Sequence, residues 1–266
     1  MKSLTLILGL LLSPMVQAFS LITWNVAEFG DHNPERLKAL IATIKERSPD
    51  IVFLQEVEKQ SLTLLRNPLA GMFDYRILEG EASRGLPQGG LLALIKRNWL
   101  PQGVHYEAFP SELDRGSLSF TLGSLCGIPH TFTNVHLESP ELLYWRSRDY
   151  RNQQVERLKI QTEKNEGIVI AGDLNLVLGK DADQLFPKDW NDAWLSLHPD
   201  DQGLTWDPDH NDMAYWGGGF LLPGFRLDRV LYKSEHLQVI RTERLGVGAH
   251  PPLSDHYGLL VEFDCR

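Results

Sequence analysis

The feature that most constrains the fold of this chain is a series of short apolar segments that end in polar side chains. The segments are residues 20–25 (SLITWN), 51–56 (IVFLQE), 130–136 (HTFTNVH) and 167–172 (GIVIAG). Apolar runs of four to eight residues bounded by polar ones are typical of buried strands. The sequence therefore predicts buried strands with reactive groups at their ends.

The polar residues at the ends of these strands have a regular spacing. Asp173 and Asn175 are two positions apart, as are Asn134 and His136, so each pair points to one side if the backbone stays extended. In sheets flanked by helices, ligands bind beyond the carboxyl ends of strands. We therefore expect one site at these ends. Its members would be Asn25, Glu56, Asn134, His136, Asp173 and Asn175.

Two helices are predicted among these strands. Asn33 is a capping residue before Pro34, apolar residues at 37, 40, 41 and 44 form one helical face, and Pro49 stops the helix. With the strands on either side, this helix makes a strand-helix-strand unit. A second, largely polar helix is predicted over residues 141–165.

The remaining segments are predicted to be antiparallel strands and one long loop. The central strands are expected at 73–78, 90–96, 104–109, 117–125 and 130–136, and the C-terminal strands at 226–232, 236–245 and 257–263. Residues 207–224 are rich in Gly, Asp and Pro and are predicted to form a functional loop.

The first 18 residues are predicted to be a secretory signal peptide. Lys2 precedes an apolar run at residues 4–12, and Val16-Gln17-Ala18 resembles a cleavage site. The run is far shorter than the roughly 20 residues of a membrane-spanning helix. Ser13-Pro14 argues against a first strand. We expect a secreted or periplasmic protein with one domain over residues 19–266.

The charge of the chain disfavours one class of function. Lys and Arg number 26 and Asp and Glu 35, so the formal net charge is −9. Proteins that coat duplex nucleic acid need a broad basic surface to neutralise phosphates. Tight non-specific binding of nucleic acid is therefore disfavoured, whereas local basic contacts remain open.

Cys126 and Cys265 are the only cysteines in the sequence. Export to an oxidising compartment would permit a disulfide between them, although sequence alone cannot show that their geometry allows one. They could equally be two small buried apolar residues. Two cysteines cannot by themselves form a structural zinc site.

Further candidate residues lie near the C-terminus. Asp228 lies in RLDRVLY, and Asp255 and His256 lie in SDHYG before the last predicted strand. A carboxylate that orients a histidine fixes its tautomer and raises its basicity. Strict strand alternation would send Asp255 and His256 to opposite faces, so a shared site requires irregular backbone at residues 254–257.

The candidate ligands indicate a hard divalent cation. Oxygen ligands such as Glu56, Asp255 and Asn25 suit Mg²⁺ or Mn²⁺ better than zinc. Such a cation, together with neutral donors from Asn and His, neutralises the charged oxygens of a phosphoester without repelling it. Phosphoester hydrolysis is the reaction class that we predict.

Five motifs in order resemble the endonuclease/exonuclease/phosphatase superfamily. They are TWN (residues 23–25), LQEV (54–57), GDLN (172–175), the segment around Asp228 and SDH (254–256). The resemblance covers nearly all of residues 19–266. It implies an α/β, DNase I-like fold, a four-layer sandwich of two packed mixed β-sheets flanked by helices. It also implies a Mg²⁺- or Mn²⁺-dependent site that cleaves phosphodiesters, those of nucleic acids included.

The resemblance also implies roles for individual residues. Glu56 is similar to the principal metal ligand, Asn25 to a metal-side or phosphate-side group, and Asp255 to an acidic partner near the metal. Asp173 would position or deprotonate the attacking water, and Asn175 would stabilise the charged transition state. His256 would contact the phosphate, and Asp228 would orient the His256 side chain.

Three motifs look most like the 5′-tyrosyl-DNA phosphodiesterase branch: HLES (136–139), TWD (205–207) and DRV (228–230). In that branch His136 and Ser139 would bind phosphate, Asn134 would lie with them on the substrate side, and Trp206 would offer a flat surface to a base or aromatic leaving group. Core packing of Trp206 is an equal alternative. A basic residue after GD-x-N-L in that branch is replaced by Val177 here.

Two other functions are compatible with the same fold. An exported lipid phosphodiesterase similar to a sphingomyelinase is one, although the only apolar stretch suited to a lipid surface is Phe220-Leu221-Leu222 beside the glycine run. A binding module without catalysis is the other. We expect a monomer that binds a phosphodiester substrate and does not insert stably into a membrane.

Overall fold

The computed structural model describes residues 18–27, 33–59, 75–79, 90–140, 144–176, 189–220 and 222–266, with 62, 65 and 186 as isolated positions. Residues 1–17 of the expected signal peptide lie outside the described residues. So do Val177, Leu221 and the expected start of the second helix at 141–143.

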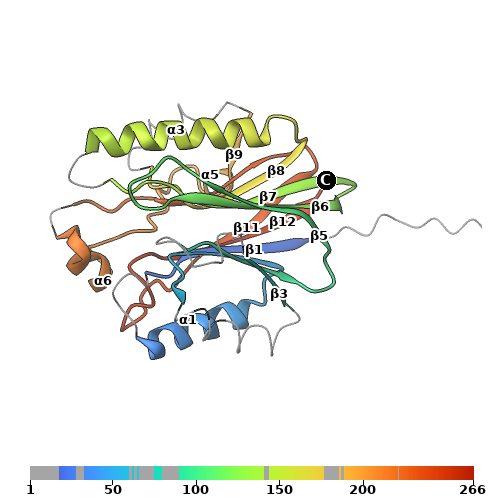
Figure 1. Ribbon diagram of the computed structural model, residues 1–266. Coiled ribbons are helices and arrows are strands. Elements are labelled where there is room, and N and C mark those ends of the chain that lie inside the picture. The colour runs from blue at the N-terminus through green and yellow to red at the C-terminus, as the bar shows by residue number, and fades with distance from the viewer. Residues whose placement is uncertain are drawn as a thin grey trace, which may run out of the picture.

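Two six-stranded sheets pack against each other with a helix outside each (Figure 1). The first sheet has the order β11-β12-β1-β2-β4-β3 and the second β5-β6-β7-β8-β10-β9. The pairs β1–β2 and β7–β8 are parallel and the others antiparallel, so both sheets are mixed. The predicted four-layer sandwich is confirmed.

The strands of the first sheet are β1 (Phe19–Asn25), β2 (Ile51–Gln55), β3 (Tyr75–Glu79), β4 (Leu92–Lys96), β11 (Leu237–Leu245) and β12 (Gly258–Cys265). Those of the second are β5 (Pro101–Ala108), β6 (Gly116–Leu125), β7 (Ile128–His136), β8 (Gly167–Asp173), β9 (Asn191–Asp192) and β10 (Asp228–Lys233). The helical segments are α1 (Pro34–Arg47), α3 (Tyr144–Thr162), α5 (Ala193–Leu197), α6 (Asp212–Ala214) and the π-helical turn η2 (Tyr215–Gly219).

Strand alternation explains the layers. Phe19 and Leu21 of β1 point into the core between the two sheets, whereas Ile22 and Trp24 point to the opposite face, against α1. A third apolar cluster lies between the second sheet and α3. Each strand near the centre of its sheet is therefore buried on both faces, which is why its sequence is apolar throughout.

The first helix begins and ends as the sequence predicts. The Asn33 side chain accepts hydrogen bonds from the backbone N–H groups of Glu35 and Arg36, and Pro34 is the first helical residue. Ser48 adopts a left-handed conformation that ends the helix just before Pro49. Because β1 and β2 are parallel and joined through α1, the predicted strand-helix-strand unit is confirmed.

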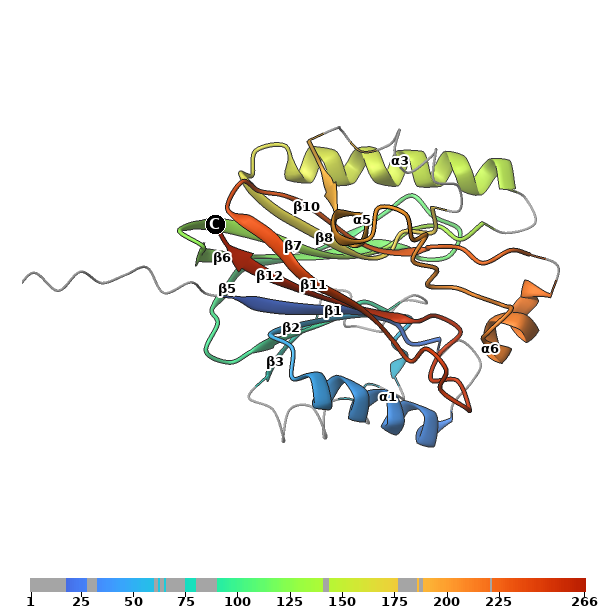
Figure 2. The same ribbon diagram turned by 180° about the vertical axis from the view of Figure 1, so that it is seen from behind.

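One expectation is confirmed and one is corrected by the structure. The central strands pair antiparallel as predicted, and they are divided between the sheets: β3 and β4 lie in the first, and β5, β6 and β7 in the second (Figure 2). The predicted loop at 207–224 contains α6 and η2, because the Asn211 side chain caps a short helix by accepting from Met213 N and Ala214 N. Local strand patterns do not show to which sheet a strand belongs.

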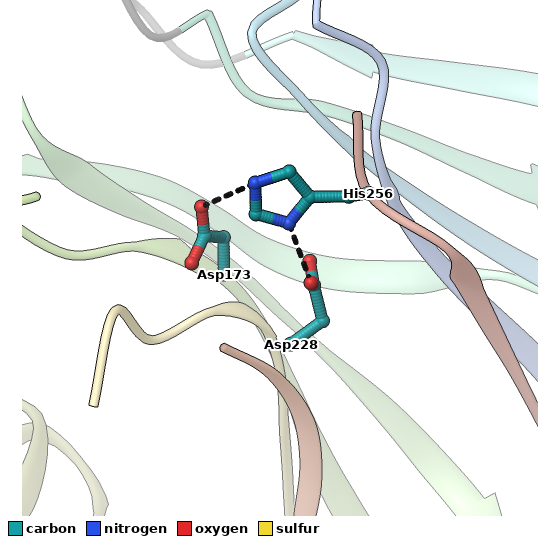
Figure 3. A group of neighbouring side chains, drawn as sticks. All are labelled: Asp173, Asp228 and His256. Carbon is teal, nitrogen blue, oxygen red and sulfur yellow. Dashed lines mark hydrogen bonds and ion pairs between the residues drawn. The ribbon is translucent and has the colours of Figure 1, made fainter. Parts of the chain in front are cut away.

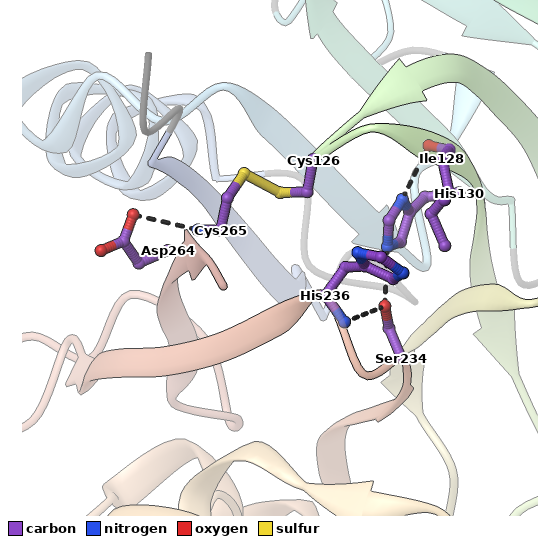
Figure 4. The surroundings of a disulfide bond; sticks show 7 residues. All are labelled: Cys126, Ile128, His130, Ser234, His236, Asp264 and Cys265. Carbon is purple, nitrogen blue, oxygen red and sulfur yellow. Dashed lines mark hydrogen bonds between the residues drawn. A yellow bond between two sulfur atoms is a disulfide. The ribbon is translucent and has the colours of Figure 1, made fainter. Parts of the chain in front are cut away.

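A disulfide joins Cys126 in the β6–β7 turn to Cys265 at the end of β12, as Figure 4 shows. It links the two sheets at the end of the sandwich where the chain terminates (Figure 1). Of the two alternatives for these cysteines, the structure therefore has the disulfide. Among the described residues, no helix combines the length and apolar character that a membrane crossing requires.

Candidate active site

The candidate active site forms where strands of both sheets end. In the second sheet, Asp173 at the end of β8 is paired with His136 at the end of β7 and with Asp228 at the start of β10. In the first sheet, Asn25 ends β1 and donates from Nδ2 to Asp173 Oδ2 over 3.1 Å. The strand ends of the two sheets therefore meet at one point, as predicted.

His256 lies between two buried aspartates (Figure 3). Its Nδ1 atom donates to Asp228 Oδ2 over 2.7 Å, and its Nε2 atom lies 4.0 Å from Asp173 Oδ2. All three side chains are at least nine-tenths buried. This arrangement gives the imidazole a fixed orientation, with one nitrogen held by a carboxylate and the other directed into the site.

Burial and neighbouring charges set the ionisation of this group. Burial opposes the charged form of His256, but Asp228, Asp255 and Asp173 outweigh it and raise the pKa of the imidazole well above its usual value. Burial also opposes the charge on Asp173, yet His256, His136 and Arg115 hold the pKa of that carboxyl well below its usual range. In both cases the neighbouring charges outweigh burial and favour the charged form, an imidazolium for His256 and a carboxylate for Asp173.

The backbone before β12 is irregular, as a shared site for Asp255 and His256 requires. The strand begins only at Gly258. The Ser254 hydroxyl donates to the Asn25 carbonyl over 2.6 Å and accepts from the His256 N–H over 3.1 Å. Trp24 Nε1 donates to the His256 carbonyl over 3.0 Å. These contacts hold His256 in place while Asp255 stays partly exposed.

Several carboxylate groups lie close together around His136 and His256. Glu56 has a left-handed backbone (φ 58°) directly after β2, its side chain is partly exposed, and its Oε1 atom lies 3.9 Å from His136 Nε2. Burial raises the pKa of Asp255, and the negative charges of Glu56, Asp173 and Asp228 raise it further. Carboxylates crowded together in this way are relieved by a bound cation, so the residues present fit a hard divalent metal ion.

The ligand atoms of Asp173, Asp228 and His256 also lie within 4.8 Å of one another, a spacing that one ion could bridge. The hydrogen bond to Asp228 already uses His256 Nδ1. We therefore retain Glu56, Asn25 and Asp255 as the predicted ligands. Both ends of the Asn25 amide already form hydrogen bonds, since Nδ2 donates to Asp173 and Oδ1 accepts from Ala27 N, so a metal ion would use the second lone pair of Oδ1.

Asn134 does not have the substrate-side position that we predicted. Its Oδ1 accepts from Gln55 Nε2 over 2.7 Å, and its Nδ2 donates to the carbonyls of Leu54 and Leu92 over 3.0 Å each. The side chain is fully buried between the two sheets. Because its partners Gln55, Leu54 and Leu92 all belong to the facing sheet, Asn134 ties the two sheets together instead of lying at the strand ends with the site.

The other predicted residues lie around the same strand ends. Asn175 adopts a left-handed backbone (φ 50°), its N–H donates to Asp173 Oδ1, and its Nδ2 donates to the Leu137 carbonyl. Ser139 is half-buried shortly after β7. The Trp206 ring stacks on Phe225 at 5.9 Å, and its backbone bridges His256. Trp206 is thus both packed and adjacent to the site.

Three residues of the site were missed by sequence reasoning. Arg115 lies just before β6 and is buried. Its Nη1 atom is 2.9 Å from Nδ1 of His136. Thr205 accepts the N–H groups of Leu227 and Asp228. Arg36 of α1 donates to the Val26, Ala27 and Leu253 carbonyls. Arg115 and Arg36 have no local sequence signal, whereas Thr205 lies within the TWD motif.

Comparisons with known proteins agree with this geometry. A family model described as "Endonuclease/Exonuclease/phosphatase family" matches residues 22–256. Tyrosyl-DNA phosphodiesterase 2 of Gallus gallus is 28% identical over 93% of this chain and 67% of its own length, and that of Rattus norvegicus 29% over 91% and 65%. The chain thus spans about two thirds of the length of these relatives.

Solved structures show the same fold. A humanized D. rerio TDP2 superposes with a TM-score of 0.76 at 21% identity, covering 92% of this chain and 98% of the other. D. rerio TDP2 complexed with a single-strand DNA product gives 0.75 at 22% identity, with the same coverage. The human Nocturnin catalytic domain gives 0.69 at 18% identity, covering 94% and 95%.

Proposed function

This chain belongs to the endonuclease/exonuclease/phosphatase family, and from that premise we propose that it is a metal-dependent phosphodiesterase that hydrolyses 5′-phosphotyrosyl bonds of single-stranded DNA. The single observation that supports catalysis most directly is the chain of contacts from Asp228 through His256 to Asp173. The similarity to tyrosyl-DNA phosphodiesterases and the bound product in one similar structure support the substrate.

The chain's own residues divide the chemistry among them. Asp173, ionised and anchored by Asn25, accepts a hydrogen bond from the attacking water and orients it. His256, held by Asp228, presents Nε2–H to a phosphate oxygen and stabilises the charge that develops there. A divalent cation held by Glu56, Asp255 and Asn25 would neutralise the phosphate. Mg²⁺ or Mn²⁺ is the ion that these oxygen ligands favour.

The test is hydrolysis of a single-stranded oligonucleotide that carries a 5′-phosphotyrosine. We expect the purified chain to release tyrosine and the 5′-phosphorylated oligonucleotide in the presence of Mg²⁺ or Mn²⁺. The reaction should stop when a chelator is added. Glu56→Gln and Asp173→Asn should each lower the rate by roughly 10²- to 10³-fold. Asp189→Asn, a change at an exposed carboxylate paired with Lys233, is the matched control. Full activity in both site variants would refute the assignment.

A lipid phosphodiester is a second candidate substrate, and one surface favours it. Tyr215, Trp216, Phe220 and Leu222 are 37%, 81%, 60% and 49% exposed, and they surround the glycines of η2. Large apolar groups that stay exposed together mark interaction surfaces. If the substrate is a lipid, the chain should bind to vesicles of zwitterionic phospholipid, and the Trp216→Ser variant should not. Cleavage of the oligonucleotide alone would reject this candidate.

We also propose that the protein is exported to an oxidising compartment and acts there as a monomer. The basic and apolar N-terminal segment supports export, as does the Cys126–Cys265 disulfide, because structural disulfides persist outside the reducing cytosol. Fractionation of cells that express the full chain, compared with one lacking residues 2–18, tests the location. Recovery of both in the cytosol with reduced thiols would refute export.

A further inference from the structure

We propose that Arg115 is a positioning residue that fixes the tautomer of His136, so that the Nε2–H of His136 is presented to a phosphate oxygen of the substrate. The identity of the acceptor rests on the proposed function. The tautomer itself does not, because it follows from the contacts of the two side chains.

The register of the second sheet brings the two residues together. β6 and β7 are antiparallel, and Gly116 at the start of β6 is paired with His136 at the end of β7. Gly116 is closely packed, since a Cβ atom there would lie 2.6 Å from the Glu107 carbonyl oxygen. Arg115 therefore lies one residue before a tightly held strand start, beside the His136 ring.

The contact between them determines where the imidazole proton lies. Arg115 Nη1 lies 2.9 Å from His136 Nδ1, and both side chains are buried. A guanidinium group has only donors and stays charged in proteins. His136 Nδ1 must therefore accept, and the ring proton of the neutral imidazole is on Nε2.

The proton on Nε2 points at the acidic part of the site. Nε2 lies 3.3 Å from Asp173 Oδ2 and 3.9 Å from Glu56 Oε1. Within the described part of the chain it is buried and makes no hydrogen bond of good geometry. A buried donor without a good acceptor is destabilising unless a ligand supplies one. A phosphate oxygen within reach of Nε2 would do so.

Without Arg115, the ring would lose the donor that occupies Nδ1. The ring proton would then no longer be confined to Nε2 by this contact. A purely structural arginine would instead affect folding alone. The two interpretations therefore differ in the protonation of each nitrogen of His136, which can be measured directly.

The decisive measurement is the ¹⁵N spectrum of histidine-labelled full-length protein, with His136 assigned by comparison with His136→Gln. In the parent protein we expect Nδ1 to show the shift of a bare nitrogen and Nε2 that of a protonated one. Arg115→Ala should abolish this difference, whereas Arg115→Lys, whose ammonium group has only donors, should preserve it. Arg151→Ala removes another buried arginine, bonded to the Glu138 carbonyl, and should leave the spectrum of His136 unchanged.

Activity provides a second and separate readout. Arg115→Ala should lower kcat on the 5′-phosphotyrosyl oligonucleotide by roughly 10²-fold with a smaller change in KM, since the aligned donor acts mainly in the transition state. Added guanidinium ions should restore part of kcat in Arg115→Ala and should not raise kcat in Arg151→Ala. An unchanged His136 tautomer in Arg115→Ala would overturn the proposal.

If the parent protein shows the expected His136 tautomer but does not cleave the oligonucleotide, only the proposed function would be overturned. If Arg115→Ala does not fold, Arg115→Met, which fills similar space without a donor, replaces it: an unchanged His136 tautomer in Arg115→Met would overturn the proposal.

Discussion

The imidazole of His256 is bonded through Nδ1 to the buried carboxylate of Asp228 over 2.7 Å, although 28 residues separate them in the sequence. The two come from different sheets: Asp228 begins β10, and His256 precedes β12. The bond therefore exists only because the sheets are packed face to face. It fixes the direction of the second imidazole nitrogen, toward Asp173.

Replacing this carboxylate by an amide should impair catalysis more than folding. In Asp228→Asn, the amide keeps the shape but loses the charge that holds His256 protonated and aligned. We expect kcat to fall roughly 10²- to 10⁴-fold. Steady-state kinetics with Asp189→Asn as the control measures this. A variant with parental kcat would show that His256 needs no carboxylate partner.

Thr205 should matter through its hydroxyl group. Oγ1 accepts the backbone N–H groups of Leu227 and Asp228 over 3.0 Å each. Thr205→Val leaves these groups unpaired, so unfolding free energy should fall by roughly 1–3 kcal/mol and kcat should fall as well. Thr205→Ser keeps the hydroxyl and should resemble the parent. Equal losses in both variants, measured by urea unfolding and kinetics, would contradict this account.

Asn134 should affect stability without affecting substrate binding. Asn134→Leu leaves Gln55 Nε2 and two backbone carbonyls without this partner, which should cost roughly 1–3 kcal/mol of unfolding free energy. KM should stay at the parental value. The double variant Gln55→Leu/Asn134→Leu should lose less than the sum of the single changes, because neither amide is then left alone. A raised KM with parental stability would restore Asn134 as a substrate ligand.

His130 should make stability depend on pH far from the active site. Burial lowers the pKa of this histidine, which also contacts the Ile128 carbonyl and the Ser234 hydroxyl (Figure 4). The unfolded chain binds the proton first, so the contribution of His130 is complete above its unfolded pKa of about 6.5 and is lost as pH falls through the lower folded pKa. The contribution of His256 has the opposite sign, because its pKa is raised.

The comparison that isolates this effect uses His130→Gln, whose side chain does not titrate. Urea unfolding of the parent and the variant at several pH values from about 7.5 to about 5 gives the difference in slope. We expect the parent to lose stability more steeply on acidification. Parallel curves would mean that His130 is protonated equally easily in both states.

The disulfide should stabilise the fold and leave the chemistry intact. The cysteines are 139 residues apart, and on the chain-entropy account a loop of this length contributes roughly 5 kcal/mol. Cys126→Ser/Cys265→Ser should therefore lower the unfolding free energy by several kcal/mol. Because Cys265 ends β12 and His256 precedes its start, kcat at low temperature should be unchanged. Loss of kcat in a folded double variant would contradict this separation.

Much of the fold could be predicted because its signals are local. The apolar run of β8, the cap at Asn33 and the stop at Pro49 each depend on neighbours in the sequence. The order of the motifs around Glu56, Asp173 and His256 likewise indicated the family. The division of strands between two sheets was not predictable, since β4 and β5 are separated by four residues yet belong to different sheets.

The residue-level errors have the same origin. Asn134 and His136 lie on the same face of β7, so their spacing alone predicts one shared role. The facing sheet covers Asn134, however, whereas His136 lies at the end of the strand, beside the site. Arg115 has no recognisable motif and joins the site only through the pairing of β6 with β7. Chemistry of this kind depends on which side chains from distant segments become neighbours.

The sequence by itself determined that this chain forms buried strands ending in acidic, amide and imidazole groups, because strand periodicity and capping are short-range properties. Only the tertiary structure decided which of these groups share a hydrogen bond, which are covered and which stay accessible. The reason is that sheet packing brings together residues with no sequence relation, and burial then sets both their partners and their charge.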